Sequence, residues 1–222
     1  KSHHEGHRAR LKSRFTTAPN SLADYELLEL LLFMAIPRRD VKPLAKTLLK
    51  KFNGIENVFA ASVPELTAIE GLSESAAIAL KSVEAAAKRM MQASVMKQPV
   101  LSSWSRLIDY CTAQMAREKT EQFRVLYMNR KNMLIADEVH QQGTVDQSAV
   151  FPREIVGRAL ALGATAVILV HNHPSGDPSP SDADVTLTHE IIRAFDPLDI
   201  VVHDHLIIAK TGHTSFKKLG LI

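Results

Sequence analysis

The most informative segment of this chain reads Ala166-Val-Ile-Leu-Val-His-Asn-His-Pro174. Its first five residues form a continuous apolar run bounded by turn-forming residues, a pattern that predicts a buried β-strand. Side chains alternate between the two faces of a strand, so His171 and His173 are predicted to point the same way and Asn172 the other way. Two imidazoles are therefore expected on one face, at the end of a strand.

A third polar side chain follows after an irregular segment. Three prolines and one glycine interrupt regular structure in residues 174–180. The chain then restarts at Ser181, a favourable helix N-cap, which places Asp184 in the first turn of a helix. The two residues also have nearly the pattern of a capping box, and a capped first turn would fix the direction of the carboxylate. Two histidines, one carboxylate and a fourth position for water are what a catalytic zinc site needs.

The spacing His-x-His-Pro-x6-Ser-x2-Asp over residues 171–184 is the JAMM signature of the MPN family of zinc metalloproteases. The whole segment resembles the bacterial branch of that family, the RadC proteins. The resemblance covers nearly the whole chain and includes Gly6-His-Arg8, Asp24-Tyr-Glu-Leu-Leu-Glu29, Asp40-Val-Lys-Pro43, Asp137-Glu-Val139 ahead of Gly143-Thr144, Pro152-Arg-Glu154 and Gly220-Leu-Ile222.

The resemblance implies a role for each residue of the predicted site. His171, His173 and Asp184 match the Zn²⁺ ligands of the family. Ser181 matches the residue that hydrogen-bonds the oxygen of the tetrahedral intermediate. Hydrolysis by a zinc-bound water also needs a carboxylate that takes the proton of the water and passes it to the leaving amine.

The general base is predicted to be Glu138. In the family this glutamate comes from a strand well upstream of the histidines, and Glu138 ends an otherwise apolar predicted strand. Glu154 is the alternative, but it falls in the first turn of a predicted helix, where the helix dipole favours acidic residues. A second His-x-His pair, His203 and His205, is interpreted as part of a packed strand and not as a second metal site.

Composition limits the class of protein. With 222 residues and 45% hydrophobic content, the chain can bury one good core or two small ones. The single cysteine, Cys111, excludes an intramolecular disulfide and is interpreted as a small core residue. The most apolar run, residues 27–36, contains Glu29 and is far shorter than the roughly 20 residues of a membrane span. No signal peptide is visible, so the expected location is cytoplasmic, without a membrane partner.

Residues 1–97 are predicted to form a small all-α domain, with helices at 24–35, 41–52, 56–61, 63–69 and 73–93. Between the last two helices, Leu66-x-x-Ile69-x-Gly71-Leu72-Ser73 resembles a helix-hairpin-helix, which presents the N–H groups of a helix N-terminus to a nucleic-acid phosphate. Ser73 replaces the usual second glycine, and two neighbouring glutamates would repel a phosphate. A packing or protein-interaction module is therefore the competing interpretation.

Charge is distributed unevenly along the chain. Residues 1–99 hold 15 Lys/Arg against 10 Asp/Glu, a net +5, and residues 100–222 hold 12 against 14, a net −2, which add to the +3 of the whole chain. Four cations crowd the beginning of the first half, namely Arg8, Arg10, Lys12 and Arg14. This asymmetry suggests an anionic partner, although basic solvated termini are also common.

Residues 100–222, after a linker at 96–99, are predicted to form an α+β or α/β sandwich, consistent with the cytidine-deaminase-like fold of MPN domains. Helices are expected at 102–117, 152–163 and 182–194. Strands are expected at 123–129, 133–139, 140–145, 165–170, 200–203 and 205–209, with a hairpin turn between the first two.

The sequence therefore predicts a RadC-like, zinc-dependent hydrolase, a metallopeptidase that cleaves an amide or isopeptide bond in a protein or peptide-like substrate. The alternative is a DNA-associated accessory protein in repair or recombination, with DNA contact through residues 1–97 and a zinc domain that is not proteolytic. Glu138 and Ser181 favour the hydrolase, because a purely structural zinc needs neither of them.

Overall fold

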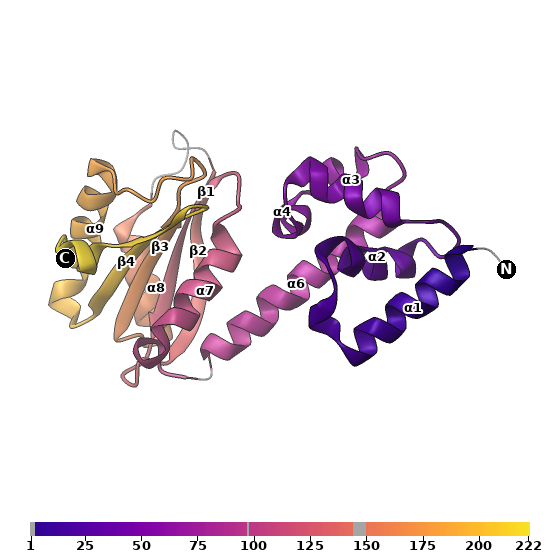
Figure 1. The fold of residues 1–222 in the computed structure, drawn as a ribbon. Helices are drawn as coiled ribbons and strands as arrows, with labels where there is room; N and C mark the ends of the chain where they lie inside the picture. The colour runs from indigo at the N-terminus through magenta and orange to yellow at the C-terminus, as the bar shows by residue number, and fades with distance from the viewer. Residues whose placement is uncertain (1–2, 97, 144–149) are drawn as a thin grey trace. The chain divides into compact units, whose positions relative to one another are not determined.

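The structure of the protein is a computed structural model that describes residues 3–96, 98–143 and 150–222. The chain divides into two compact units, Lys1–Ala87 and Lys88–Ile222. In the described residues the first unit is entirely helical, and the second contains the sheet (Figure 1). The division falls within α6 (Glu74–Met96), about ten residues before the boundary predicted from the sequence. The reason is that Met91 and Val95, near the end of α6, pack into the core of the second unit.

The helical unit is built around one apolar core. Its elements are α1 (His3–Thr17), η1 (Pro19–Ser21), α2 (Asp24–Ala35), α3 (Lys42–Phe52), α4 (Ile55–Ala60), α5 (Val63–Thr67) and the beginning of α6. The core includes Leu28 and Leu32 of α2 and Leu48 of α3. The sequence did not predict α1 as a separate helix, because this segment has no apolar stripe and, among residues 6–17, whose burial is described, contributes only Leu11 to the core.

Two local details of this unit explain how its helices begin. The sequence predicted that Asp24 caps α2, but the N-cap is Ala23. The Glu26 carboxylate accepts the N–H of Ala23 and closes the first turn. Between α5 and α6, Gly71 has a φ of +85°, a conformation that glycine adopts without strain. The Ser73 hydroxyl then accepts an N–H from the first turn of α6.

Two of the cations near the start of the chain hold the helical unit together. The Arg8 guanidinium donates to three backbone carbonyls in the loop after α2, those of Ile36, Pro37 and Arg39. The same guanidinium lies 4.4 Å from the ring centroid of Phe33. Arg14 pairs with Glu26 at 2.7 Å. Part of the positive charge in this region therefore has a structural role.

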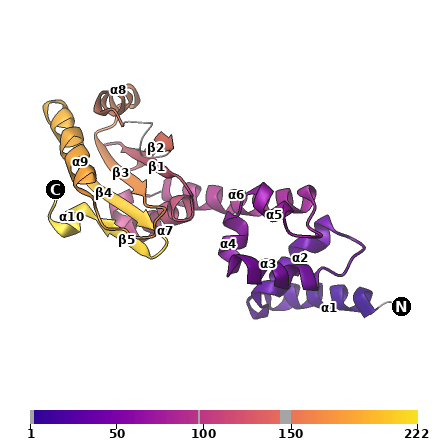
Figure 2. The ribbon, with the colours of Figure 1, turned by 90° about the horizontal axis from the view of Figure 1, so that it is seen from above.

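The second unit contains a five-stranded mixed sheet with helices on both faces. The strands are β1 (Glu121–Met128), β2 (Leu134–Gly143), β3 (Ala166–Asn172), β4 (Val201–Ala209) and β5 (Gly212–Ser215), in the order β2-β1-β3-β4-β5. Only β3 and β4 are parallel neighbours. One face carries α7 (Trp104–Met115), preceded by η2 (Val100–Ser103), and the other carries α8 (Pro152–Leu162) and α9 (Asp182–Phe195) (Figure 2). The chain continues through η3 (Asp196–Leu198) before β4 and α10 (Phe216–Leu219) after β5.

The central strand β3 is buried on both faces, which explains its continuous apolar run. Ile168 and Val170 face the α7 side together with Cys111, which is a buried core residue as predicted. Val167 and Leu169 face the α8 and α9 side. The next residue on that second side is His171, so the packing of β3 decides the direction of this imidazole.

Some strand boundaries predicted from the sequence are wrong. Residues 140–143 continue β2 and are not a separate strand, whereas 144 and 145 lie outside the described residues. Residues 201–209 form the single strand β4, which includes Asp204, and not two strands on either side of it. The buried Asp204 carboxylate accepts the Ser215 hydroxyl and the N–H of Lys217. The sequence missed the short elements β5 and α10. Within the part of the chain that the structure describes, no helix has the length and apolar character needed to cross a membrane.

We expect the substitution Arg8→Met to lower the free energy of unfolding of the helical unit by about 1–2 kcal/mol, because three carbonyls lose a charged donor. Lys12→Met is the matched control on the exposed part of α1, and it should change stability by less than about 0.5 kcal/mol. Urea unfolding of the full chain measures the loss. Hydrogen–deuterium exchange should be faster in residues 36–41 of the Arg8 variant, and equal exchange in both variants would contradict the assigned role.

Candidate metal centre

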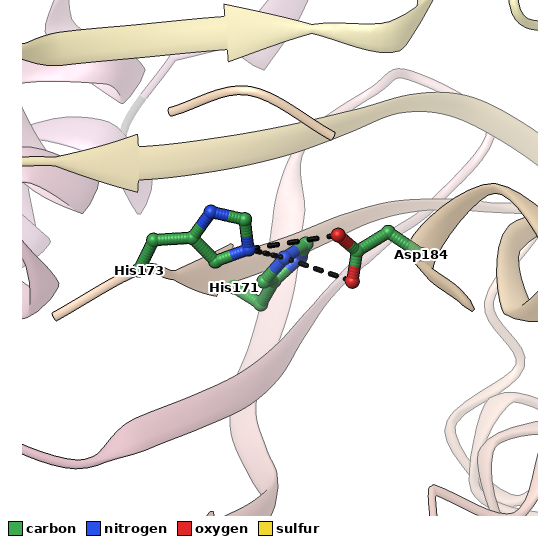
Figure 3. A group of neighbouring side chains, drawn as sticks. All are labelled: His171, His173 and Asp184. Atoms are coloured by element: carbon green, nitrogen blue, oxygen red, sulfur yellow. Dashed lines mark hydrogen bonds and ion pairs between the residues drawn. The ribbon is translucent and has the colours of Figure 1, made fainter. Parts of the chain in front are cut away.

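Three side chains with metal-binding atoms lie together at the end of β3 (Figure 3). His171 is on β3, His173 follows the strand directly, and Asp184 is in the first turn of α9. The Nε2 atoms of the two histidines are 2.9 Å apart. The Asp184 carboxylate lies 3.2 Å from Nε2 of His171 through Oδ1 and 3.5 Å from Nε2 of His173 through Oδ2. The structure thus brings together the three residues that the sequence predicted as ligands.

The spacing of these atoms fits a zinc ion. With bonds of about 2.0–2.1 Å and tetrahedral angles, neighbouring ligand atoms around zinc are about 3.3 Å apart. The three separations of 2.9, 3.2 and 3.5 Å lie on both sides of that value. The last two separations end on different oxygens of the Asp184 carboxylate, and one ligand atom from each of the three residues lies within 4.8 Å of the other two. The group can therefore supply three of the four ligands of a tetrahedral zinc ion, which leaves a fourth position for water.

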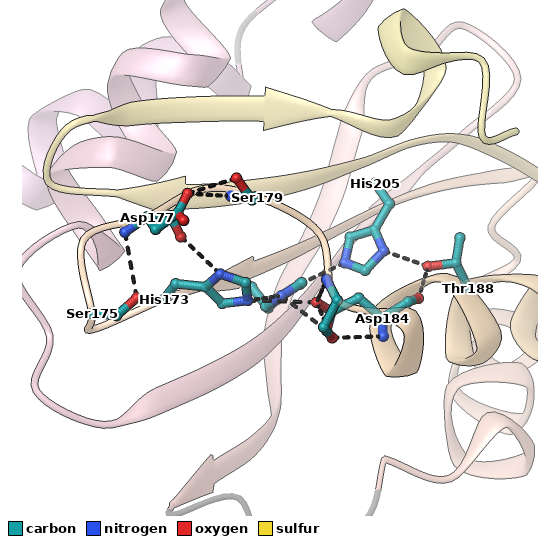
Figure 4. A network of polar contacts seen from close by, with 9 residues as sticks. His173, Ser175, Asp177, Ser179, Asp184, Thr188 and His205 are labelled. Carbon is teal, nitrogen blue, oxygen red and sulfur yellow. Dashed lines mark hydrogen bonds and ion pairs between the residues drawn. The ribbon is translucent and has the colours of Figure 1, made fainter.

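The loop after β3 fixes the orientation of His173. Its Nδ1 lies 2.9 Å from the backbone carbonyl of Asp177, which can only accept a hydrogen bond. Nδ1 therefore donates, and in the neutral ring Nε2 presents a lone pair to the group. The Asp177 carboxylate in turn accepts the N–H and the hydroxyl of Ser179, so this Pro- and Gly-containing loop has its own hydrogen bonds (Figure 4).

The start of α9 fixes the orientation of Asp184. Its Oδ2 accepts the N–H of Ser181 at 2.8 Å and the hydroxyl at 2.7 Å, and its own N–H donates back to the Ser181 hydroxyl. This is the capping box suggested by the sequence. Burial opposes the charged form of Asp184, but the proximity of His171 and the hydrogen bonds from Ser181 outweigh it and hold the pKa of the carboxyl well below its usual range. Asp184 is therefore ionised.

Glu138, the predicted general base, lies elsewhere on the sheet. It is on β2, opposite Val125 of β1, which pairs in turn with Leu169 of β3. Strand spacing and rise put its Cα about 12 Å from that of His171. Its carboxylate accepts three hydrogen bonds from Arg158 at 2.5–2.9 Å, and these contacts lower the pKa of Glu138. The role of Glu138 as a base stays a prediction.

Glu121 is a second candidate for the base, and the sequence interpretation missed it. It is the first residue of β1, two positions before Phe123, so both side chains belong to the same face. Phe123 pairs with His171 and stacks on its ring, with centroids 6.2 Å apart. If this antiparallel pairing is continued by two residues, Glu121 comes opposite His173. The predicted strand began only at residue 123 and so left Glu121 out. The signal that could have found it is the alternation of residues 121, 123, 125 and 127, which puts these side chains on one face of the strand.

The side chain of Asn172 connects β1 and β3 beyond their last backbone pair. Its side-chain oxygen accepts the N–H of Gln122 at 2.8 Å, and its amide donates to the carbonyl of Thr120 at 3.1 Å. These bonds hold the beginning of β1 against the end of β3. The half-buried Glu121 lies between the two tied residues.

The second His-x-His pair separates into two different environments. His203 is half-buried and contacts Oδ1 of Asn132 at 2.8 Å, away from the group of three. His205 is fully buried, and its Nε2 lies 2.8 Å from Nδ1 of His171. Burial, followed by the proximity of His171, lowers the pKa of His205 well below its usual value, so this ring is neutral. The sequence interpretation treated His205 as strand packing and missed its contact with the site.

The fold and this group define a mixed α/β domain with a candidate metal centre of two histidines and one aspartate. A family model, the RadC-like JAB domain, matches residues 101–221. The match covers more than half of the chain, and the chain belongs to this family, which confirms the resemblance to RadC proteins. The family is related to the JAMM metalloproteases, and the His-His-Asp group is compatible with that relationship.

We expect the purified full chain to bind about one zinc ion and His173→Ala to lose most of it, because only two of the three ligands would remain. His203→Ala is the matched control, since it removes a histidine of the same unit that lies outside the group. Elemental analysis after dialysis measures the metal content. A His173→Ala variant with full zinc content would rule out this ligand set.

Proposed function

We propose that the protein is a zinc-dependent metallopeptidase of the JAMM type that hydrolyses an amide or isopeptide bond. The observation that carries this proposal is the convergence of His171, His173 and Asp184 at separations that suit three ligands of a tetrahedral zinc ion. A centre with three protein ligands is typical of catalytic zinc, whereas structural zinc usually has four. Membership in a family related to metalloproteases supports the same proposal.

The zinc ion, a carboxylate and Ser181 would each have a separate role in the reaction. When bound, zinc supplies an acidified water and polarises the scissile carbonyl. A carboxylate takes a proton from the attacking water and returns it to the leaving nitrogen. Ser181 would stabilise the developing oxyanion, since its hydroxyl is beside the ligand Asp184 and can rotate its hydrogen from Oδ2 toward the substrate.

We assign the proton transfer to Glu121. A general base must come within hydrogen-bond reach of the proton that it abstracts. The β1/β3 pairing ends at Phe123 and His171, and its extension by two residues would bring Glu121 opposite His173. Glu138, in contrast, is two strands from His171 and is held by Arg158. An ion pair of that kind also lowers the pKa of Glu138 and weakens it as a base.

The substrate of this activity would be a protein or peptide.

DNA contact through residues 1–97, the basis of the alternative function, also stays a prediction. The turn at Gly71 between α5 and α6 resembles a helix-hairpin-helix, which favours it. Arg8 and Arg14, however, are engaged within the helical unit. Binding of the full chain to duplex DNA that weakens steeply with salt would support the alternative.

We expect Glu121→Gln to keep the zinc content of the wild-type chain and to lower the rate of hydrolysis by about 10²–10⁴-fold, the usual loss for a general base. Glu138→Gln is the matched control, and it should retain more of the activity. The assay incubates each zinc-loaded protein with a peptide library prepared from a whole proteome and identifies new amino termini by mass spectrometry.

The pair of variants separates the possible errors. If Glu138→Gln loses activity and Glu121→Gln keeps it, the base is Glu138. If Glu121→Gln loses zinc, Glu121 is a ligand, and the proposed ligand set is incomplete. A zinc-loaded wild-type chain that cleaves no peptide would oppose the hydrolase function itself.

A further inference from the structure

A chain of hydrogen bonds runs behind the candidate metal centre and connects two of its ligands (Figure 4). Nδ1 of His171 lies 2.8 Å from Nε2 of His205. Nδ1 of His205 lies 2.6 Å from the hydroxyl oxygen of Thr188, and this hydroxyl lies 2.6 Å from the backbone carbonyl of Asp184. The chain therefore begins at one ligand side chain and ends at the backbone of another.

The Thr188 hydroxyl determines the order of hydrogens at its end of the chain. Two oxygens 2.6 Å apart need a hydrogen between them, and the carbonyl of Asp184 has none to give. Thr188 therefore donates to that carbonyl. Its single hydrogen is then used, so the hydroxyl oxygen must accept from the Nδ1–H of His205.

The same logic continues through the two rings. A neutral imidazole that donates from Nδ1 has a lone pair on Nε2, so His205 accepts at Nε2. His171 must then donate from its Nδ1. The Nε2 atom of His171 is left with a lone pair, and this atom is the one that faces His173 and Asp184. The reverse order would put a hydrogen on Nε2 of His171, where it would block a metal ion.

The surroundings of His205 give it few other choices. His205 is fully buried and Thr188 is 1% exposed. The rings of Phe123 and Phe216 pack against His205, with centroid separations of 5.6 and 4.5 Å. Buried polar groups among apolar rings are costly unless they are hydrogen-bonded, so both nitrogens of His205 depend on the two partners described here.

We propose that His205 and Thr188 are positioning residues that fix the hydrogen of His171 on Nδ1 and so present its Nε2 lone pair to a metal ion. This inference rests on the proposed zinc site and adds the residues that support it. Outer partners of this kind orient a ligating histidine and raise its basicity, and their loss typically lowers metal affinity by about 10–100-fold.

Two substitutions of Thr188 test the role of the hydroxyl. Thr188→Val has nearly the same shape but no hydroxyl, and we expect it to weaken zinc binding by about 10–100-fold. Thr188→Ser keeps the hydroxyl and should bind zinc almost as the wild-type chain does. Competition of the full chain with a chromophoric chelator gives the dissociation constants. A merely structural role would give equal affinity in the two variants or a greater loss in Thr188→Ser, and either result would overturn the proposal.

A second measurement reads the hydrogens directly and needs neither zinc nor catalysis. Imidazole ¹⁵N NMR of the full chain, at a pH above histidine titration, should show Nδ1–H forms for His171 and His205. A hydrogen on Nε2 of His205 would overturn the proposal. The two levels of inference fail separately: a chain that binds no zinc refutes the proposed function, whereas unchanged zinc affinity in Thr188→Val refutes only the positioning role.

Discussion

The antiparallel register between β1 and β3 is the constraint on which the candidate centre depends. It pairs Phe123 with His171 and directs both side chains to the face that carries α9. A slip of one residue would turn His171 toward α7 and leave Asp184 without its histidines. The register is held by the apolar packing of β3 on both faces and, at its end, by the side chain of Asn172, which bonds the backbone of β1.

The centre also depends on how three short segments end or begin. In the loop after β3, the carbonyl of Asp177 accepts a hydrogen bond from His173. α9 begins with a capping box that holds Asp184. The strand β4, the parallel neighbour of β3, carries His205, whose ring contacts the ring of His171. Each ligand is therefore fixed by a bond to backbone or to a buried side chain, which is the arrangement that metal sites need.

The sequence predicted what local patterns determine and missed what only pairing reveals. The apolar run before His171 and the Ser181 cap are local, and both are found in the structure. His205 reaches the site through strand register, which a single sequence does not show, and the assignment of Glu121 as base rests on the same register. Helix α1 was missed for a different reason, because it is attached through one buried leucine and through polar side chains such as Arg8 and Arg14, and these do not produce a periodic apolar pattern.

Asp184 serves both the start of α9 and the candidate centre, and this double use has an evolutionary consequence. Its Oδ2 holds the Ser181 N–H, whereas its Oδ1 is directed to His171. An asparagine at this position would keep an oxygen acceptor for the helix start and lose the negative charge that favours a cation. One substitution can therefore weaken the candidate metal centre while the scaffold survives, and such a scaffold would be free to evolve as a recognition module.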